Sequence, residues 1–540
     1  MKPELDVDSA GADGATPSAW FVRSVPLGGS PLSRALQADP AMHGWLAPRP
    51  ADLAGWTSHV RALQLRARET DWLTPLAPAI AATGRAAERL GRAAAHGVVV
   101  TTGQQPGLFG GPAYTFSKAL SALAMADALE EATGVPIAPI FWAASDDADW
   151  VEAAVTYFAT PNGLQTVSLE GPATNGIAMS DVTLGPLQSA LDVLRSACGS
   201  MAHESILTVV EHAYVPHATV GAAYVQLLRA TLEPLGIAVL DAAHPALRQA
   251  ADPILRRALQ QASAVQDALI ARTAAIVAEG FTPQVDVMDA LTLVFRTESG
   301  DSGRERDRVR TRVPVGDAAR VVREADPATL GSNVLLRPVV ERALLPTIAY
   351  HAGPGEYAYF AQVAPVAAAL GLDAPIAVPR WSGEVIERRA ELLRDRLGID
   401  DASLLDPHAA ETQVARAAVD MDTQDAIERL RVAIETQVRA VGDAVARADD
   451  LVMPEVVSGL AGDLEQRILR FERRVLAGTK RRETERLREV AAVRAALRPH
   501  GTSPERTLNL VPMLARYGPA VFDAMRSHAR AYVERLVTAP

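Results

Sequence analysis

The spacing of apolar residues in the first third of the chain predicts helices followed by a buried strand. Residues 59–70 and 80–95 mix apolar and polar positions as helices do, and prolines separate the two segments. Residues 97–102 (Gly-Val-Val-Val-Thr-Thr) are β-branched and largely apolar, which is typical of a strand inside a parallel sheet. A glycine-rich loop at 103–111 follows this strand directly.

A helix and a second strand are predicted after the glycine-rich loop. Pro112 is a favourable first residue for a helix over 113–132, and Gly134 is a typical C-terminal cap. Residues 136–142 form a second apolar run. Strand, loop, helix and strand make a βαβ unit, whose right-handed crossover leaves the two strands parallel.

Later segments repeat this alternation and extend the predicted parallel sheet. A helix at 218–235 precedes an apolar run at 236–241, and strands are predicted at 344–350 and 374–379 with a helix between them. Residues 297–325 are rich in charge, so we expect an inserted segment of strands or loops there. The predicted fold class is α/β.

The pattern changes again after residue 380. Apolar residues recur at spacings of three and four, with charges between them, over 427–445, 464–475 and 487–497. Pro454 lies at a natural break between these segments. The pattern predicts an antiparallel α-helical coiled coil, which serves either as an intramolecular arm or as a surface for dimerisation.

We therefore divide the chain of 540 residues into four parts. Residues 1–19 are small and acidic, lack the basic-then-apolar order of a signal peptide, and are expected to be a disordered tail. Residues 20–380 are the expected catalytic core, 381–499 the coiled-coil arm, and 500–540 a C-terminal segment that docks back on the core. No apolar run approaches the roughly 20 residues that span a bilayer, so we expect a cytoplasmic protein.

Composition narrows the classes of function. A net charge of −11 argues against general nucleic-acid binding, which needs clustered basic residues. The single cysteine, Cys198, excludes an internal disulfide, and we expect an inert thiol because no charged neighbour activates it. Of the 53 basic residues only three are lysines, namely Lys2, Lys118 and Lys480. A lysine just behind the glycine-rich loop is therefore unexpected on composition, and its compact ammonium suits a contact with phosphate.

Loops at the predicted strand ends carry the candidate chemistry, since ligands of parallel sheets bind at that edge. The loop 103–111 holds four glycines before a helix N-terminus, where free N–H groups attract phosphate or carboxylate. A tight structural turn is the alternative, because the spacing matches neither the dinucleotide-binding fingerprint nor the P-loop.

Carboxylates gather at the end of the second strand. Asp146, Asp147 and Asp149 repel one another and need a cation, an amine or water between them. They are suited to hold a substrate ammonium or Mg²⁺ or to act as a general base, and a solvated loop is the alternative. A later turn, Gly353-Pro-Gly-Glu356, again places glycines and a carboxylate at a strand end.

Six segments of the chain together resemble one enzyme family. They are Thr102–Thr115 with Lys118, Phe141–Trp150, Asn333–Pro338, Ala349–Gln362, Val378–Arg380 and Pro504–Arg506. In this order they resemble the cysteine-adding enzymes of bacillithiol biosynthesis, also called cysteine ligases. The matches extend from about residue 98 to the C-terminus, and the long first segment is highly specific.

The resemblance implies a Rossmann-like parallel-sheet core with inserted connecting segments and a C-terminal coiled coil that supports homodimers. It implies an amide bond between cysteine and the amino group of glucosaminyl malate, the last step of bacillithiol biosynthesis. By analogy with adenylate-forming enzymes, ATP or another nucleotide, with Mg²⁺, is the expected activator of the cysteine carboxylate. The expected partners are these small molecules, with no nucleic acid and no membrane.

The resemblance and the predicted strand ends supply the candidate residues. The expected catalytic residues are Asp146, Asp147, Asp149 and Lys118. The residues expected to bind substrate or nucleotide are Gly103, Gln104, Gln105, Gly107, Gly110, Gly111, Thr115, Trp150, Asn333, Arg337, Gly353, Gly355, Glu356, Tyr359, Gln362 and Arg380. No residue is assigned as a metal ligand.

Two histidines are missing from the family's acidic segment, which usually reads Glu-Asp-His-Asp and often has Asn-His shortly after it. Ala148 and Val155 stand where the family usually has histidine. The chain therefore either accepts a different amine, or His351 takes over the missing role. A nucleotidyl transferase or an amide ligase for another amine is one alternative function, and a non-catalytic coiled-coil scaffold is another.

Overall fold

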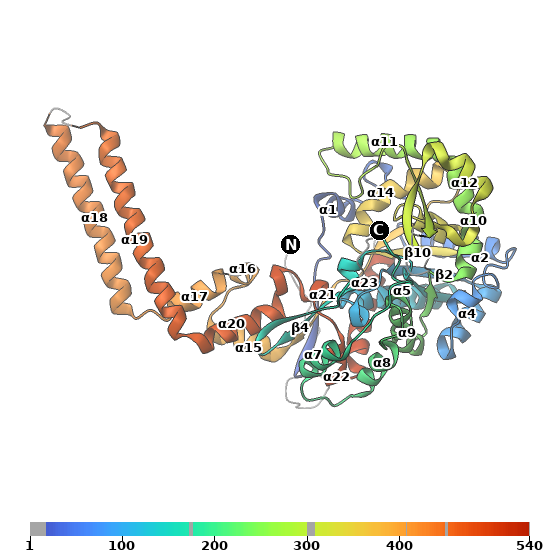
Figure 1. The fold of residues 1–540 in the computed structure, drawn as a ribbon, viewed down its shortest axis with the longest axis horizontal. Coiled ribbons are helices and arrows are strands. Elements are labelled where there is room, and N and C mark those ends of the chain that lie inside the picture. The colour runs from blue at the N-terminus through green and yellow to red at the C-terminus, as the bar shows by residue number, and fades with distance from the viewer. Residues whose placement is uncertain (1–17, 172–175, 300–307, 407, 449–451, 539–540) are drawn as a thin grey trace. The chain divides into compact units, whose positions relative to one another are not determined.

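The computed structural model describes residues 18–171, 176–299, 308–406, 408–448 and 452–538 (Figure 1). The expected tail at 1–19 lies almost wholly outside the described residues. The chain divides into two compact units. The first comprises Met1–Phe158, Thr166–Val385 and Glu505–Pro540, and the second comprises Ala159–Gln165 and Ile386–Pro504. None of the described helices combines the length and the apolar character needed to cross a membrane.

A five-stranded parallel sheet forms the centre of the first unit. Its order is β11 (Ala377–Pro379), β10 (Thr347–Ala352), β2 (Val98–Gln104), β3 (Ile137–Ala143) and β6 (Ala238–Asp241). The sheet grows outward from β2 in both directions, first through β3 and β6 and later through β10 and β11. The predicted parallel α/β core is thereby confirmed, and its order reverses between β2 and β10, where such sheets bind ligands.

Helices cover both faces of this sheet because its strands are apolar on both sides. Val98 and Val100 point into one cluster, and Val99 points into the other. The first cluster is completed by α2 (Leu53–Ala67), α5 (Tyr114–Thr133) and α23 (Ala520–Thr538). The second is completed by α3 (Ala77–Ile80), α4 (Gly84–His96) and α10 (Pro245–Gln260).

The helix predicted over 113–132 is α5, which ends at Gly134 in the left-handed conformation, with φ of 69°. Pro112 does not open this helix as predicted. It instead forms an isolated bridge with Asn509, and the N–H of Ala113 donates to the carbonyl of Leu508 at 2.9 Å. The returning C-terminal chain therefore delays the start of α5 to Tyr114.

The charge-rich insertion does contain strands. Strands β7 (Leu291–Ser299), β8 (Arg308–Pro314) and β9 (Leu330–Ser332) form a small antiparallel sheet in the order β8–β7–β9. The helix α14 (Pro354–Ala369) follows β10 and packs on α11 (Ala262–Ala278).

The remaining elements of the first unit complete its layers. They include β1 (Trp20–Ser24), α1 (Pro31–Ala38), α6 (Trp150–Ala153), β4 (Val155–Thr160), β5 (Gly163–Ser168), α7 (Gln188–Cys198), α8 (Ser205–Ala213), α9 (Val220–Leu232), α12 (Ala318–Glu324), α13 (Arg337–Leu344), β12 (Gly383–Glu387), α21 (Pro504–Thr507) and α22 (Val511–Tyr517). Of these, β4, β5, β12 and α21 extend across the boundary between the units.

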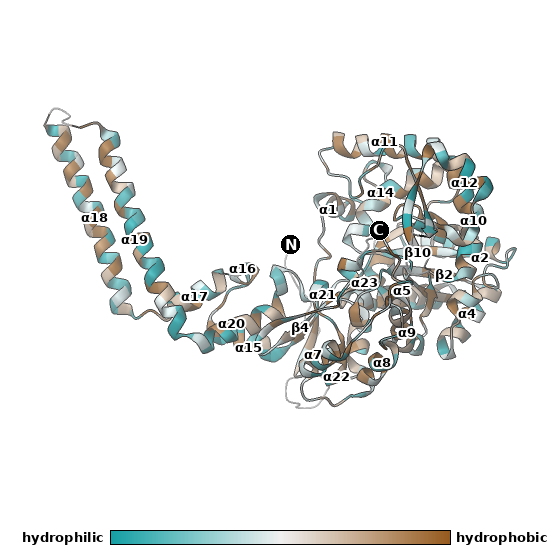
Figure 2. Ribbon diagram, viewed as in Figure 1, coloured by the Kyte–Doolittle hydropathy of each residue, from teal (hydrophilic) through white to brown (hydrophobic). Residues whose placement is uncertain are grey.

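In the second unit, α18 (Met421–Arg447) and α19 (Pro454–Arg482) form the predicted antiparallel hairpin, with Pro454 at the first turn of α19 (Figures 1 and 2). The third predicted segment, 487–497, is not part of this hairpin. It lies in α20 (Thr484–Leu497), which packs on α15 (Arg388–Leu397) and α17 (Ala409–Ala417) and buries its apolar side chains there.

Residues Glu505–Pro540 belong to the first unit. Phe522 in α23 lies against Phe116 in α5, with ring centroids 5.3 Å apart, and both side chains are buried. Burial of α23 against α5 thus ties the two ends of the first unit together.

The Phe116→Ala substitution should destabilise the first unit by about 3–5 kcal/mol, the usual result of truncating a buried aromatic ring. Chemical denaturation followed by circular dichroism measures the change. Leu65→Ala is the matched control, because Leu65 is 63% exposed on α2. This substitution should change the free energy of unfolding by no more than about 0.5 kcal/mol. Equal effects of the two substitutions would contradict this packing.

Candidate active site

A cavity of about 510 Å³ lies at the carboxyl ends of the parallel strands. Strand β2 ends at Gln104, β3 leads into Asp147, β10 leads into Gly353 and β11 leads into Arg380. All four residues line the cavity. The loops that the sequence placed at one edge of the sheet therefore meet there.

Thirteen of the predicted site residues line this cavity. They are Gly103, Gln104, Gln105, Lys118, Asp146, Asp147, Asn333, Arg337, Gly353, Gly355, Glu356, Tyr359 and Arg380.

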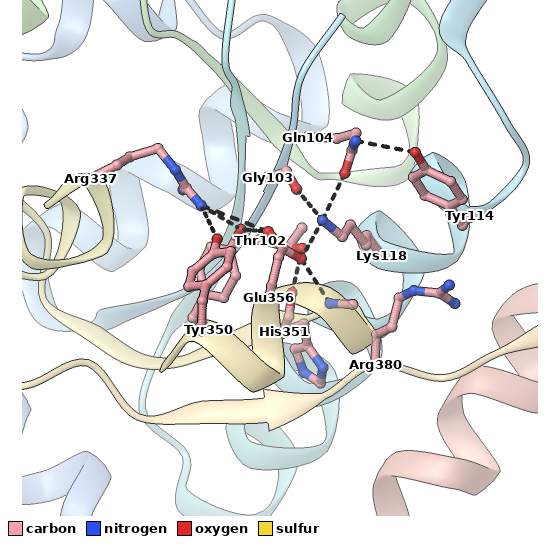
Figure 3. Close-up of polar contacts among 12 residues, drawn as sticks. Thr102, Gly103, Gln104, Tyr114, Lys118, Arg337, Tyr350, His351, Glu356 and Arg380 are labelled. Carbon is pink, nitrogen blue, oxygen red and sulfur yellow. Dashed lines mark hydrogen bonds and ion pairs between the residues drawn. The ribbon is translucent and has the colours of Figure 1, made fainter. Parts of the chain in front are cut away.

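Lys118 is the centre of a buried polar cluster in the cavity wall (Figure 3). Its ammonium donates to the carbonyl of Gly103 at 2.6 Å and to Oε1 of Gln104 at 2.8 Å, and it forms an ion pair with Glu356. Burial lowers the pKa of Lys118, and Glu356 opposes that shift. The pair joins α5, which follows β2, to the first turn of α14, which follows β10, and so bridges the point where the strand order reverses.

Glu356 is held by several donors besides Lys118. The N–H of Gly353 donates to its Oε2 at 2.7 Å, the hydroxyl of Tyr350 donates to its Oε1 at 2.6 Å, and Arg337 lies 3.7 Å from Oε1. Burial would raise the pKa of Glu356, but the charges of Lys118 and Arg337 outweigh burial and lower it. Glu356 is therefore a fixed anion that orders the cations around it.

Arg337 forms a second layer behind this pair. It donates to Glu341 at 3.2 Å and to the hydroxyls of Tyr350 and Tyr359, each at 3.2 Å. Its guanidinium also lies over the ring of Tyr350, at 5.3 Å from the centroid. Burial raises the pKa of Glu341 to about 7, although Arg337 opposes the shift.

Carboxylates line a further part of the cavity, which we call the acidic wall. Asp147 is held by the N–H of Ala148, which donates to its Oδ1 at 2.7 Å. Burial raises the pKa of Asp147, and the neighbouring charge of Asp146 raises it further. Asp146 is tied to the inserted sheet, because Arg310 in β8 donates to its carbonyl and lies 3.7 Å from its Oδ2.

Glu152, in α6, adds a further carboxylate to this wall. It accepts from Nε2 of Gln105 at 2.5 Å and from the hydroxyl of Tyr114 at 3.0 Å, and Tyr114 in turn accepts from Nε2 of Gln104 at 3.3 Å. Burial raises the pKa of Glu152, and the hydrogen bond from Tyr114 opposes that shift. A continuous row of polar side chains thus connects the Lys118 cluster to the acidic wall.

Two predicted residues of the acidic segment lie outside the cavity. Asp149 caps α6, because its Oδ1 accepts from the N–H of Glu152 at 3.1 Å. Trp150 packs against Gly171, where a Cβ would come within 2.2 Å of the indole nitrogen. The structure therefore does not bring Asp149 and Trp150 together with the other candidate residues, and their roles stay predictions.

Most of the glycine-rich loop lies outside the cavity and packs within the fold. A Cβ on Gly107 would lie 2.6 Å from Cα of Gly111, so the loop packs on itself. Gly110 donates to the hydroxyl of Tyr214 at 3.3 Å, and Thr115 is buried beside this loop. The residues of this segment that line the cavity are Gly103, Gln104 and Gln105. The cavity lining does not include Gly107, Gly110, Gly111 or Thr115.

Gln362 is the last predicted residue outside the cavity. Its buried amide accepts from the N–H of Val285 at 3.1 Å and donates to the carbonyl of Val285 at 2.8 Å. Both groups of the amide are thus engaged in holding a neighbouring loop.

His351 does not replace the histidines missing from the acidic segment. It lies within β10, is fully buried, and does not line the cavity. Burial lowers its pKa to about 3, so its imidazole is neutral. Cys198 is buried too, and burial raises the pKa of its thiol to about 11, in line with the expected inert thiol.

The described residues contain no group of three or more His, Cys, Asp and Glu side chains arranged to hold a metal ion. Asp149 is turned toward the helix that it caps, which separates it from Asp146 and Asp147 in function.

Sequence reasoning missed several residues of the site. They are Tyr114, Glu152, Phe295, Arg310 and Arg506, which line the cavity, and Glu341 and Glu505, which lie behind it. Tyr114 and Arg506 stand within segments that carried the family resemblance, and Glu152 comes one turn after the acidic cluster. Arg310 had no such signal, because it reaches the cavity from the distant insertion.

Family comparisons agree with this architecture. The model of the bacillithiol biosynthesis BshC N-terminal Rossmann-like domain matches residues 49–381, and that of the BshC C-terminal coiled-coil domain matches 384–534. The chain belongs to the BshC family. The family match also confirms the Rossmann-like core and the C-terminal coiled coil expected from the resemblance.

Curated relatives are similar over most of their length. A protein of Koribacter versatilis is 30% identical over 451 residues, which cover 81% of this chain and 82% of the relative. A protein of Salinibacter ruber is 29% identical over 80% of this chain and 81% of the relative. Both carry the name "Putative cysteine ligase BshC". The family is therefore one of ligases, which form C–N bonds.

The raised pKa of Glu341 predicts a pH-dependent stability. Because the folded state holds the proton of Glu341 up to about pH 7, against 4.5 for an ordinary glutamate, stability should fall as pH rises through this window. Glu341→Gln should remove the contribution of this carboxyl group to the pH-dependent loss of stability, on the order of 1–3 kcal/mol. Thermal melts at several pH values measure it, with exposed Glu324→Gln as the control. Parallel pH profiles for wild type and Glu341→Gln would contradict the assignment.

Proposed function

We propose that the chain joins cysteine to the amino group of glucosaminyl malate, in the cytoplasm, with nucleotide-dependent activation of the cysteine carboxylate. The observation that carries the proposal is that carboxylates and cations line the same cavity. The carboxylates Asp146, Asp147 and Glu152 make up the acidic wall, and the cations Lys118 and Arg337, called the basic wall below, line the cavity as well. The names of the curated relatives support cysteine as one substrate.

The acidic wall suits the attacking amine. A primary amine must lose a proton as its nitrogen bonds to the carbonyl carbon, and a carboxylate with a raised pKa is a fitting acceptor. Asp147 meets this need, because burial and Asp146 raise its pKa. The C–N bond forms, the activating group leaves with its electron pair, and Asp147 takes the proton from nitrogen.

The basic wall suits the carboxylate and the activating group. Lys118 and Arg337 bring positive charge to the cavity, and the first turn of α14 begins beside them at Gly353. Among the described residues, Nδ2 of Asn333 and Nε of Arg380 are buried donors without an acceptor. These unfilled donors fit the carboxylate oxygens of cysteine or the phosphate oxygens of a bound nucleotide. ATP with Mg²⁺, when bound, supplies the energy for amide formation.

Mass spectrometry of purified protein with ATP, Mg²⁺, cysteine and glucosaminyl malate tests the proposal. The expected product has the mass of bacillithiol and appears together with AMP or ADP, which identifies the activating group. Folded protein that forms no product from these substrates would contradict the proposed acceptor.

A different amine is the second candidate acceptor, and one observation supports it. Ala148 lines the cavity at a position where the family usually has histidine. The smaller side chain changes the wall next to Asp147, where the amine would lie. The same assay with other amino sugars and amino acids distinguishes the two acceptors by the mass of the product.

Two isosteric substitutions separate catalysis from helix capping in the acidic segment. Asp147→Asn removes the proposed proton acceptor and should lower kcat by about a hundredfold or more. Asp149→Asn should keep kcat within about threefold, because asparagine caps a helix as well as aspartate does. Steady-state kinetics of product formation measures both. A large loss in Asp149→Asn, or none in Asp147→Asn, would contradict the assignment.

We also propose that the helical hairpin joins two copies of the chain. Ile427, Ile434 and Val438 are partly covered within the hairpin, whereas Leu430 and Phe471 remain 48% and 52% exposed. Figure 2 shows hydrophobic positions along both helices of the hairpin. Such exposed apolar residues on long charged helices are suited to cover those of a second hairpin.

The double substitution Leu430→Glu with Phe471→Glu should convert a dimer into a monomer, because buried like charges oppose association. Light scattering after size exclusion measures the mass in solution. Val151→Glu, at a site 78% exposed outside the hairpin, is the control and should leave the mass unchanged. A wild-type protein of monomeric mass would overturn this proposal.

A further inference from the structure

The cations that line the cavity differ in whether a carboxylate of the chain already neutralises them. Lys118 and Arg337 are both paired with Glu356, and Arg310 is paired with Asp146. Arg380 is paired with Glu505, at 2.8 and 3.0 Å.

Arg506 is different. It lines the same cavity, its side chain is exposed, and it has no hydrogen-bond or ion-pair partner within the part of the chain that the structure describes. The cavity therefore has one guanidinium whose donors are all available to a ligand.

The residue before Arg506 is anchored from several sides. Glu505 is 2% exposed and accepts from Arg380, from the hydroxyl of Ser382 at 2.6 Å, from the N–H of Gly383 at 3.2 Å and from the hydroxyl of Ser117 at 3.3 Å. These donors come from α5 and from the segment after β11, so Glu505 fixes the returning chain to the edge of the sheet.

The chain just after Arg506 is anchored as well. The carbonyl of Leu508 accepts from Ala113, and Nδ2 of Asn509 donates to the carbonyls of Leu108 and Phe109 at 3.2 and 3.0 Å. The backbone at Arg506 is therefore held from both sides while its side chain stays free. A cation placed in this way is positioned in advance for a ligand and loses little entropy on binding.

We propose that Arg506 is the anion-recognition residue of this cavity, that it binds a carboxylate or phosphate group of a substrate, and that Glu505 is its positioning residue. The guanidinium offers a planar pair of donors that matches either oxyanion. The inference rests on the proposed function for the identity of the ligand, because the acceptor contributes carboxylates and the nucleotide contributes phosphates.

The surroundings of Arg506 support this assignment. Burial raises the pKa of Tyr114, and the charges of Arg380 and Arg506 act against that shift. Arg506 therefore acts near Tyr114, whose hydroxyl donates to Glu152 in the acidic wall. An anion bound by Arg506 lies within reach of the wall where the amine is expected, which fits an acceptor that carries both groups.

Isothermal titration calorimetry on the full chain tests the proposal with three probes. They are ADP, glucosaminyl malate, and methyl glucosaminide, which has the amino sugar without the carboxylates. Arg506→Gln should weaken the binding of one anionic probe by about tenfold to a hundredfold and leave methyl glucosaminide unaffected. Weaker binding of glucosaminyl malate would identify the recognised anion as a carboxylate. Weaker binding of ADP would identify it as a phosphate.

Matched variants separate recognition from general effects. Arg506→Lys should recover part of the lost affinity, because the charge remains. Arg61→Gln, at an exposed arginine of α2, should bind every probe as wild type does. Glu505→Gln should weaken the same probe as Arg506→Gln in protein whose unfolding transition is intact, and Glu505→Asp should recover part of that loss.

The proposal is overturned if Arg506→Gln binds both anionic probes with wild-type affinity, or if wild type binds neither. Its failure can be told apart from failure of the proposed function. Wild type that forms the amide, together with unchanged binding in Arg506→Gln, rejects only the role of Arg506. If the wild-type protein forms no amide, and Arg506→Gln still binds the anionic probe more weakly than the wild type does, only the proposed reaction is rejected.

Discussion

The buried ion pair between Lys118 and Glu356 is the interaction on which the rest of the site depends. It lies where the order of the parallel strands reverses, and it joins the helix after β2 to the helix after β10. A buried charge is costly unless it is paired and hydrogen-bonded. Lys118 meets this condition with the carbonyl of Gly103 and the amide of Gln104, and Glu356 meets it with Gly353, Tyr350 and Arg337.

The returning C-terminal segment is the second constraint. After the helical arm, the chain re-enters the first unit at Glu505. There Glu505 fixes Arg380, Asn509 fixes the glycine-rich loop, and Arg506 is left facing the cavity. Residues separated by about four hundred positions in the sequence thus complete one wall, which explains why the C-terminal segment is part of the core.

The sequence allowed the core and one edge of the site to be predicted, for a clear physical reason. Strands buried on both faces are continuous apolar runs, and parallel strands end at a common edge, so Gln104, Asp147 and Gly353 could be placed together. Arg380 was added by the family resemblance. Within each loop, however, the sequence does not say which side chains face the cavity. Asp147 and Asp149 are two positions apart, yet only Asp147 lines it, because Asp149 caps α6.

Residues supplied by distant elements were beyond prediction. Arg310 comes from an inserted strand, and Glu341 contacts Arg337 from behind the cavity wall. Arg506 has no carboxylate partner among the described residues, whereas the other cations that line the cavity are paired with carboxylates. These roles follow from tertiary packing alone. The family resemblance pointed to the segment of Arg506 but not to its role.

A double-substitution cycle on Lys118 and Glu356 tests the central claim most directly. Turnover is measured for Lys118→Met, Glu356→Gln and the double variant, each shown to be folded by its thermal transition. If the pair organises the site, each single substitution lowers turnover by about a hundredfold or more, and the double variant is little worse than either. Losses that simply multiply, or a Lys118→Met variant with wild-type turnover, would contradict the account.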